Sequence, residues 1–287
     1  MIAVCKHELS GYFHSLTAYI FGAFLLAFVG IGAMIYNIQQ AVANFEYVLS
    51  FVSLIFVVLV PVLTMRTIAE ERKQKTDQLL YSLPLTATEV VAGKYLALLA
   101  VYLIPLCMIC IYPWIFAQFG EVYLLTSYGS IAAFFMMGAA LIAVGMFLSS
   151  LTDNLGFAAG IGIPVILFNY YSVSLAEHVS STALGSAVVL CLLCCLLGFV
   201  IRLLTRNEGL AYGVSLLLIA ATGGAYLIKP EIFEGLLPGL MKKLSLFERF
   251  NTFVSGVFDL SSIVYYFTVI VFFLFLTVQS LEKRRYN

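Results

Sequence analysis

Charged residues are scarce in this chain of 287 residues, of which Asp, Glu, Lys and Arg make up 10%. Soluble domains carry about 25% charged residues, and about half of their residues are apolar. Here 62% are apolar and the mean hydropathy is +1.04. A soluble fold of this length would bury only about 75% of its unfolded surface, so much of the apolar excess would face water. The composition therefore excludes an ordinary soluble domain and indicates a membrane protein.

The chain also lacks an excess of charge of either sign. Lys plus Arg and Asp plus Glu number 15 each, so the formal net charge at pH 7 is zero. No overall electrostatic field favours a nucleic acid as a partner. Information about partners has to come from where individual charges stand along the chain.

Side chains that bind metals or form disulfides are few, with six cysteines and three histidines. All the cysteines lie in or beside apolar segments, so a disulfide framework is not expected. The histidines include no i, i+4 pair of the kind that binds zinc. Cys191, Cys194 and Cys195 cluster in one apolar segment with no histidine or carboxylate nearby. We expect packing residues there and no metal site.

A nucleotide-binding loop is absent as well. A P-loop needs a glycine-rich turn followed by Lys and then Ser or Thr. The nearest approach is at Gly93 and Lys94, but Thr88 stands where the first glycine belongs and Tyr95 follows the lysine. We predict no catalytic residue and no cofactor in this chain, so that any ATP hydrolysis takes place in a partner chain.

Ionisable residues are missing from the middle of the apolar segments and stand only at their ends or in loops. Such a group at the bilayer centre costs at least about 2.5–3.5 kcal/mol and usually marks an ion or proton pathway. Its absence disfavours a pump or carrier driven by ions, and it leaves an uncharged channel open.

Long apolar runs are what the sequence has in abundance. Crossing about 30 Å of hydrocarbon takes about 20 apolar residues in a helix. Eight stretches approach this length, at residues 18–39, 47–65, 95–117, 128–149, 155–175, 183–204, 210–228 and 260–280. The sequence therefore predicts an all-α integral membrane protein, a polytopic bundle of about eight transmembrane helices that forms one transmembrane domain over residues 1–287.

Basic residues are distributed unevenly between the predicted loops, and this bias indicates the orientation. With the N-terminus inside, the cytoplasmic basic residues are Lys6, Arg66, Arg72, Lys73, Lys75, Lys94, Arg202, Arg206, Lys283, Arg284 and Arg285. Those outside are Lys229, Lys242, Lys243 and Arg249. The bias predicts that both termini are cytoplasmic.

The longest predicted cytoplasmic loop, residues 66–94, has a charged half and then an apolar group. Its first half favours a helix, with Glu71 and Lys75 placed as an i, i+4 ion pair. Thr86 and Glu89 have capping-box spacing, which predicts that a new helix begins there. The loop can dock a cytoplasmic partner, or it can be a solvated connector on the bilayer surface. The docking candidates are Glu70, Glu71, Arg72, Leu79, Leu80, Leu83 and the helix-breaking Pro84.

The segment 229–259 before the last span is too polar to cross the membrane, yet it has apolar residues at helical spacing. Short amphipathic helices in the outer interface are predicted. The segment can be an interfacial lid, or it can form a gate or a contact for cargo or an extracytoplasmic partner. The candidate gate residues are Phe233, Phe247 and Phe250.

Small residues inside the spans predict close helix packing. Gly138 and Gly145 lie two turns apart on one helix face, and Gly156 and Gly160 form a small-xxx-small pair. Such residues let helices approach closely where lipid provides no hydrophobic drive for association. Kinks are expected at Pro61, Pro105, Pro113 and Pro164.

The cytoplasmic loop also resembles a known family. From Ala69 to Tyr95 it reads AEERKQKTDQLLYSLPLTATEVVAGKY. This acidic-basic run, followed by a Leu-Leu pair, a Pro and a Gly-Lys, is similar to the signature region of ABC-2-type transporter permeases, and in particular of the gliding-motility-type ABC permease family. Three further stretches resemble the same family: NFEYVLSFVSLIFVVLVPVLTMR from Asn44, GMFLSSLTDN from Gly145, and LSLFERFNTFVSGVFDLSSIVYYFTVIVFFLFLTVQSLEKRR from Leu244.

The resemblance implies a permease subunit of an ABC exporter, powered by a separate cytoplasmic ABC ATPase. Residues 66–94 would contain the coupling helix that contacts the ATPase, and residues 1–17 would form an amphipathic elbow on the inner surface. We expect a dimer of identical or different permease subunits in the lipid bilayer of a prokaryotic cell membrane.

The chain departs from the common six-span pattern of that family by an extra helix pair over residues 183–228. The transported cargo is therefore not carried over from the family. A membrane scaffold or assembly factor without cargo is the alternative, because the lack of charge inside the membrane equally allows it.

Overall fold

The computed structural model describes the chain except for residues 77–84, 179–181, 206–207 and 286–287. Every regular element among the described residues is helical, which confirms the all-α prediction. The described chain forms two compact units. Unit 1 consists of Met1–Tyr170 and Arg249–Arg285, and unit 2 contains Tyr171–Glu248.

Unit 1 begins with a short helix and a long apolar one. Helix α1 (Ile2–His14) ends at Ser15, whose extended backbone (φ −94°, ψ 159°) separates it from α2 (Leu16–Ala33). A π-helical turn, η1 (Met34–Gln39), continues α2. The other helices that contribute to unit 1 are α3 (Glu46–Ser53), α4 (Phe56–Thr64), α5 (Arg66–Gln74), α7 (Ala87–Ile109), α8 (Ile111–Phe116), α9 (Leu124–Ser150), α10 (Leu155–His178), α14 (Leu246–Val254) and α15 (Leu260–Arg285).

Within the described residues, five helices are long and apolar enough to cross a membrane, and a bent pair is a sixth candidate. The five are Leu16–Gln39, Ala87–Phe116, Leu124–Ser150, Leu155–His178 and Leu260–Lys283, and the bent pair is Glu46–Ser53 with Phe56–Gln74. They correspond to six of the eight predicted spans. The other two fall on α11 and α12, whose described apolar stretches, Ala183–Cys195 and Tyr212–Tyr226, are shorter than a span. The count of eight stays a prediction.

The bent pair turns by 59° between α3 and α4. At the break, the N–H of Ile55 bonds to the carbonyl of Val52 at 3.0 Å, and the N–H of Val57 bonds to that of Leu54 at 3.1 Å. These bonds span three residues instead of four, so the helical ladder is interrupted there. The sharp bend therefore lies before Pro61, which stands inside α4.

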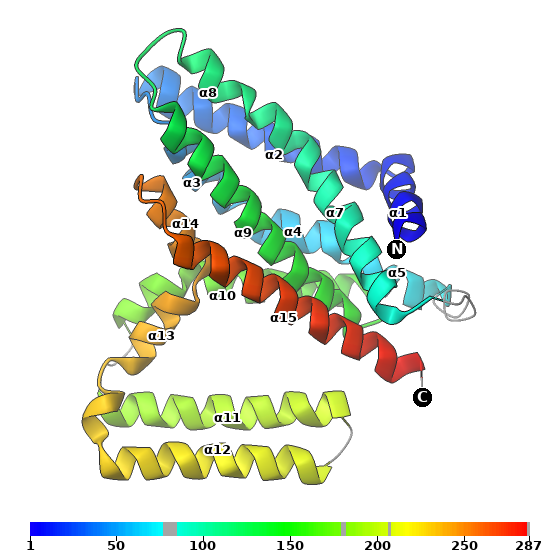
Figure 1. Ribbon diagram of the computed structural model, residues 1–287, viewed down its shortest axis with the longest axis vertical. Helices are drawn as coiled ribbons and strands as arrows, with labels where there is room; N and C mark the ends of the chain where they lie inside the picture. The colour runs from blue at the N-terminus through cyan, green and yellow to red at the C-terminus, as the bar shows by residue number, and fades with distance from the viewer. Residues whose placement is uncertain (77–84, 179–181, 206–207, 286–287) are drawn as a thin grey trace. The chain divides into compact units, whose positions relative to one another are not determined.

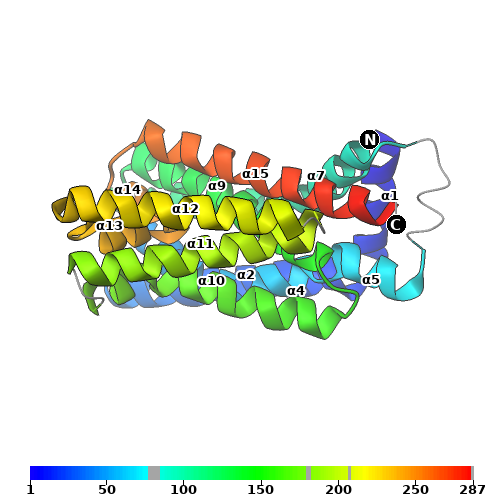
Figure 2. The ribbon, with the colours of Figure 1, turned by 90° about the horizontal axis from the view of Figure 1, so that it is seen from below.

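Helix α9 forms the centre of unit 1, with 78% of its most apolar window buried. It packs against α3, α4, α5, α7 and α15, and Figures 1 and 2 both show α15 lying alongside it. An aromatic cluster fills the middle, where Phe134 stacks on Phe56 with ring centroids 4.7 Å apart and Tyr102 meets Phe56 edge-on at 5.6 Å. A helix that is apolar all round is expected at such a buried position.

Two glycines on α9 permit this packing, as the sequence predicts. A Cβ at Gly138 would stand 2.6 Å from the ring of Tyr102, and one at Gly145 would stand under 3.0 Å from Thr64. Only glycine fits at either position without movement of its neighbour. At Gly160 on α10, by contrast, no described atom lies within 4 Å of the place of a Cβ. No other described helix of unit 1 therefore packs against the Gly156–Gly160 pair.

Capping groups fix the starts of two long helices. Thr86 and Glu89 form the predicted capping box of α7, with the Glu89 N–H donating to Thr86 Oγ1 at 3.3 Å and the Thr86 N–H donating to Glu89 Oε2 at 3.2 Å. Before α15, Asp259 accepts bonds from the backbone N–H groups of Ser261 and Ser262. The hydroxyl of Ser262 also donates to Asp259 and holds the pKa of that carboxyl below its ordinary value.

Unit 2 contains a hairpin of α11 (Ala183–Thr205) and α12 (Glu208–Ile228), which lie side by side in Figures 1 and 2. Arg202 and Glu208 form an ion pair where the two helices connect. The hairpin is followed by the 3-10 turn η2 (Pro230–Phe233) and by α13 (Leu236–Leu244). The short helices predicted over residues 229–259 are thus present as η2, α13 and α14.

Candidate functional site

Helix α5 leads from the bent span towards the segment that the sequence marks for docking. It follows Met65 and ends at Lys75, which takes a left-handed conformation with φ of 58°. Arg72 and Lys73 stand in its last turn, where basic groups complement the helix dipole. The docking candidates Leu79, Leu80, Leu83 and Pro84 lie outside the described residues. The described elements that flank them are α5 and the start of α7.

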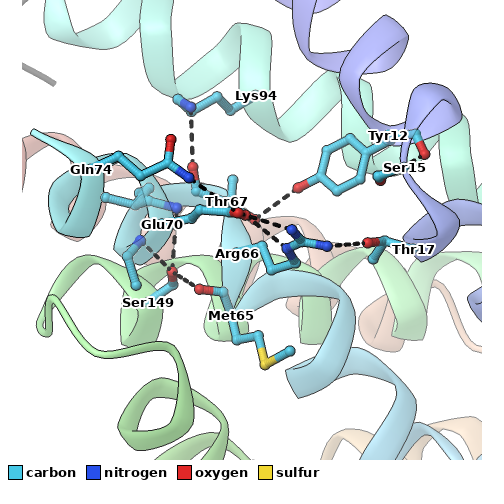
Figure 3. Close-up of polar contacts among 12 residues, drawn as sticks. Tyr12, Ser15, Thr17, Met65, Arg66, Thr67, Glu70, Gln74, Lys94 and Ser149 are labelled. Atoms are coloured by element: carbon cyan, nitrogen blue, oxygen red, sulfur yellow. Dashed lines mark hydrogen bonds and ion pairs between the residues drawn. The ribbon is translucent and has the colours of Figure 1, made fainter. Parts of the chain in front are cut away.

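The ammonium group of Lys94 is buried where α1, α5 and α7 meet. Lys94 is only 1% exposed. Its Nζ donates to Glu8 Oε1 on α1 at 2.7 Å, to Glu71 Oε1 on α5 at 2.6 Å, and to the carbonyl of Thr67 at 3.0 Å. The last bond is drawn in Figure 3. Three acceptors use all three donors of the ammonium group, which is the condition under which a buried charge is tolerated.

Helix α5 is also tied to α1 and α2, as Figure 3 shows. The hydroxyl of Tyr12 on α1 lies 3.2 Å from that of Thr67. Arg66 donates to Thr17 Oγ1 on α2 at 2.7 Å and to the two carboxylate oxygens of Glu70 at 2.7 and 2.9 Å. Burial raises the pKa of the Tyr12 hydroxyl well above its ordinary value, so this group stays protonated at neutral pH and can donate.

Ser149 on α9 caps the first turn of α5 from a neighbouring helix (Figure 3). Its Oγ accepts from the N–H groups of Ile68 at 3.3 Å and Ala69 at 3.2 Å, and it donates to the carbonyl of Met65 at 3.0 Å. N–H groups in the first turn of a helix need an acceptor from outside that helix. One buried hydroxyl supplies it here and fixes the position of α5 on α9.

Arg72 fastens the far end of α5. Its guanidinium group donates to the carbonyl of Ser150, and Nη1 lies 3.9 Å from Asp153 Oδ1. The hydroxyl of Ser280 on α15 donates to the same carbonyl at 3.0 Å. The end of α9 therefore connects α5 with α15.

These contacts make up what we call the α5 junction. It consists of Glu8, Tyr12, Thr17, Arg66, Thr67, Glu70, Glu71, Arg72, Lys94, Ser149 and Ser150. Most of its bonds involve a charged group, and charge-assisted hydrogen bonds are stronger than neutral ones. These bonds connect α5 to α1, α2, α7 and α9. The junction has no group of three or more His, Cys, Asp or Glu that could hold a metal ion, nor does the rest of the described chain.

The three charged docking candidates thus lie on α5, each with a partner inside the chain. Glu70 contacts Arg66, and Arg72 reaches the end of α9. Glu71 contacts Lys94 instead of Lys75, the i, i+4 partner expected from the sequence. Lys75 has left the helical conformation, so the i, i+4 spacing does not hold at that position.

Sequence reasoning missed the burial of Lys94 and its partner Glu8. The available signal was a single lysine in the apolar stretch EVVAGKYLALL at the start of a predicted span. Such a cation needs acidic or carbonyl partners. Helical spacing alone does not reveal which of the 15 acidic residues supplies them, because Glu8 and Glu71 come from other helices.

The three candidate gate residues are buried. Phe233 ends η2 in unit 2, where it meets Tyr226 edge-on with ring centroids 5.8 Å apart. Phe250 on α14 packs against Phe134 of α9 at 5.7 Å within unit 1. Phe247, also on α14, is 3% exposed.

The sequence of the chain matches the model of a known protein family. The model of ABC-2 family transporter proteins matches residues 33–181, just over half of the chain. The chain belongs to the ABC-2 transporter family. This ABC-2 membership supports a permease role in an ABC transporter, for a protein with several membrane-spanning helices. A comparison with curated proteins found no match.

The ABC-2 match includes part of the α5 junction. Arg66, Glu71, Lys94 and Ser149 fall inside the matched residues, whereas Glu8 on α1 precedes them. The matched residues contain η1, the bent span, α5, α7, α8, α9 and α10. Helices α11 to α15 lie beyond the match.

Proposed function

We propose that this chain is the permease subunit of an ABC exporter, powered by a separate cytoplasmic ATPase that docks on residues 66–94. Family membership supports the permease role, and the absence of a P-loop in the sequence supports a separate ATPase. The observation that carries the docking position is the α5 junction. Helix α5, which forms the first part of the docking segment, is bonded to α1, α2, α7 and α9, so a displacement of this helix would act on those four helices.

In the proposed mechanism the ATPase displaces α5 when it binds or hydrolyses ATP. Helix α4 follows α5, because Met65 alone separates them. Helix α3 is held separately at its other end, where the hydroxyl of buried Ser127 on α9 donates to Glu46 Oε1 at 2.9 Å. The break between α3 and α4 is then the place where the bent span changes its angle, as hinges do in transporters that alternate between two arrangements.

The basic-residue bias supports an orientation with both termini and the α5 junction on the cytoplasmic side. The resemblance to gliding-motility-type permeases supports a prokaryotic cell membrane. In this orientation α1 lies on the inner surface as an elbow. The loop motif supports the gliding-motility-type subfamily, with a dimer of identical or different permease subunits as the working unit. We also propose that α11 and α12 complete a set of eight spans.

Helix α14 lies at the opposite end of unit 1 from α1 and α5 in Figures 1 and 2. In the proposed orientation this is the outer end. Phe250, on the part of this helix that belongs to unit 1, is therefore proposed as part of an outer gate or as a contact for cargo or an extracytoplasmic partner. Phe233 and Phe247, which belong to unit 2, are proposed for the same role from the sequence alone.

The docking role is tested with Leu80→Ala, Leu83→Ala and the control Lys73→Ala, each co-purified with the ABC ATPase subunit that accompanies the native chain. Loss of one well-buried apolar anchor costs about 2 kcal/mol or more, roughly thirtyfold in binding. Lys73 is exposed and should contribute only about 0–1 kcal/mol. We expect both leucine variants to weaken ATPase association and transport-coupled hydrolysis far more than Lys73→Ala, at equal membrane insertion.

Wild-type association in all three variants would show that residues 66–94 are a solvated connector. If the ATPase binds but the chain never alters its hydrolysis and no cargo moves, the scaffold or assembly role replaces the exporter.

A further inference from the structure

A groove of about 350 Å³ lies in unit 1 between the first turns of α7 and the last turns of α15. Among its lining residues, Val91 on α7 and Val278 on α15 are buried, and Phe275 on α15 is 57% exposed. The volume is at the lower end of the range for small-molecule sites, about 300–1,000 Å³. It suits one molecule or one part of a longer molecule.

The polar groups of the groove gather at one end. On α7 the polar residue, Thr88, comes before the apolar Val91 as the chain enters the span. On α15 the chain leaves the span, and the polar residues Gln279 and Glu282 come after the apolar Phe275 and Val278. Both helices thus place their polar groups at the same end of the groove, and their apolar groups further along it.

This polar end coincides with the boundary of the membrane-spanning segments. The candidate span of α7 begins at Ala87, and that of α15 ends at Lys283. Figures 1 and 2 bring the start of α7 and the end of α15 to the same end of unit 1. With α7 entering the membrane at Ala87, before the Tyr95 that the sequence alone predicts, the apolar part of the groove is placed beside lipid chains and its polar part beside lipid headgroups.

The charged and polar residues that line the groove indicate which class of ligand it can bind. The carboxylate of Glu282 is the one formal charge among the groove's lining residues, all of which the structure describes. It favours a cationic group, whereas the hydroxyl of Thr88 and the amide of Gln279 can donate to phosphate oxygens. A molecule with an acyl chain, a phosphate and an ammonium group matches all three features.

We propose that the groove between α7 and α15 binds one phospholipid with a primary ammonium headgroup, of the phosphatidylethanolamine class. The acyl chain lies over Val91 and Val278. The ammonium group bonds to Glu282, and the phosphate accepts from Thr88 and Gln279. Thr88, Val91 and Ala92 also fall within residues 66–94, where the ATPase is proposed to dock, so the lipid site is tested on the chain alone, without the ATPase.

The test uses the full chain in vesicles that contain equal amounts of phosphatidylethanolamine and phosphatidylglycerol. After extraction into mild detergent, native mass spectrometry counts the lipids that remain bound to each chain. Val278→Trp fills the groove, and Val271→Trp is the matched control on the same helix, at a position that does not line the groove. We expect wild type and Val271→Trp to retain one phosphatidylethanolamine, and Val278→Trp to lose it by about tenfold or more.

The variant Glu282→Gln tests the headgroup separately and keeps the groove open. We expect it to bind the two lipids about equally, because the attraction for the ammonium group is gone. Equal binding of the two lipids by the wild type would overturn the proposal. So would unchanged phosphatidylethanolamine retention in Val278→Trp.

Discussion

The α5 junction and the middle of α9 are both buried in unit 1, but different forces hold them. At the junction, Lys94 is surrounded by two carboxylates and a carbonyl. In the middle of α9 the contacts are aromatic and steric, with Tyr102 packed against Gly138. Directional charged contacts fail when one partner changes, whereas apolar packing responds to volume. Charge pairing is thus concentrated at the end of unit 1 where a partner is proposed to act. Where the helices cross the membrane, close packing of side chains holds them together.

The largest effect should come from removing the central charge of the junction. Lys94→Met leaves the carboxylates of Glu8 and Glu71 facing each other without a cation. Removing one partner of a buried ion pair typically costs about 3–5 kcal/mol. We expect a loss of this size in the free energy of unfolding, measured by titration with a denaturing detergent.

Two further variants make this prediction specific. Lys73→Met, on the exposed side of α5, should change stability little. The triple variant Lys94→Met, Glu8→Gln, Glu71→Gln should regain most of the loss, because no unpaired charge remains. If Lys94→Met proves as stable as Lys73→Met, charge pairing does not hold the junction together.

An intermediate effect is expected in the apolar region. Gly138→Ala places a Cβ 2.6 Å from the ring of Tyr102, whose hydroxyl is bound to the carbonyl of Phe134 at 2.9 Å. The ring cannot move away without losing that bond, and overpacking a core costs about 1–3 kcal/mol. Gly129→Ala on the same helix meets open space and should stabilise by up to about 1 kcal/mol through helix propensity. Equal unfolding free energies for the two variants would show that α9 is not closely packed at Gly138.

Much of unit 1 could be predicted from the sequence, because spans and caps are local signals. The six candidate spans follow from runs of apolar residues, and the start of α7 follows from the spacing of Thr86 and Glu89. The glycines of α9 could be recognised as packing positions from their spacing. Their partners, Tyr102 and Thr64, could not, because they come from other helices.

The α5 junction shows what could not be predicted from the sequence. The loop motif marks Glu70, Glu71 and Arg72, but it says nothing of Glu8 or Ser149, which lie far away in the sequence. Their roles depend on how α1 and α9 meet α5. The break between α3 and α4 was equally hidden, because residues 47–65 read as one continuous apolar run with Pro61 as its obvious weak point.

The smallest effect should come from the partly exposed ion pair of Arg66 and Glu70 in the same junction. It tests whether the burial of the cation sets the strength of an ion pair, because Lys94 is 1% exposed in the other pair. The side chains of Arg66 and Glu70 are 36% and 29% exposed, and such pairs contribute only about 0–1 kcal/mol. Glu70→Gln keeps an acceptor oxygen for Arg66, so we expect a loss below about 1 kcal/mol that shrinks when salt rises from 0.1 to 1 M, since the screening length falls from about 10 Å to about 3 Å. The matched variant Glu71→Gln weakens a bond to buried Lys94, so its loss should be larger and should change little with salt. A greater loss for Glu70→Gln than for Glu71→Gln, or the same salt dependence for both, would show that burial does not separate the two pairs.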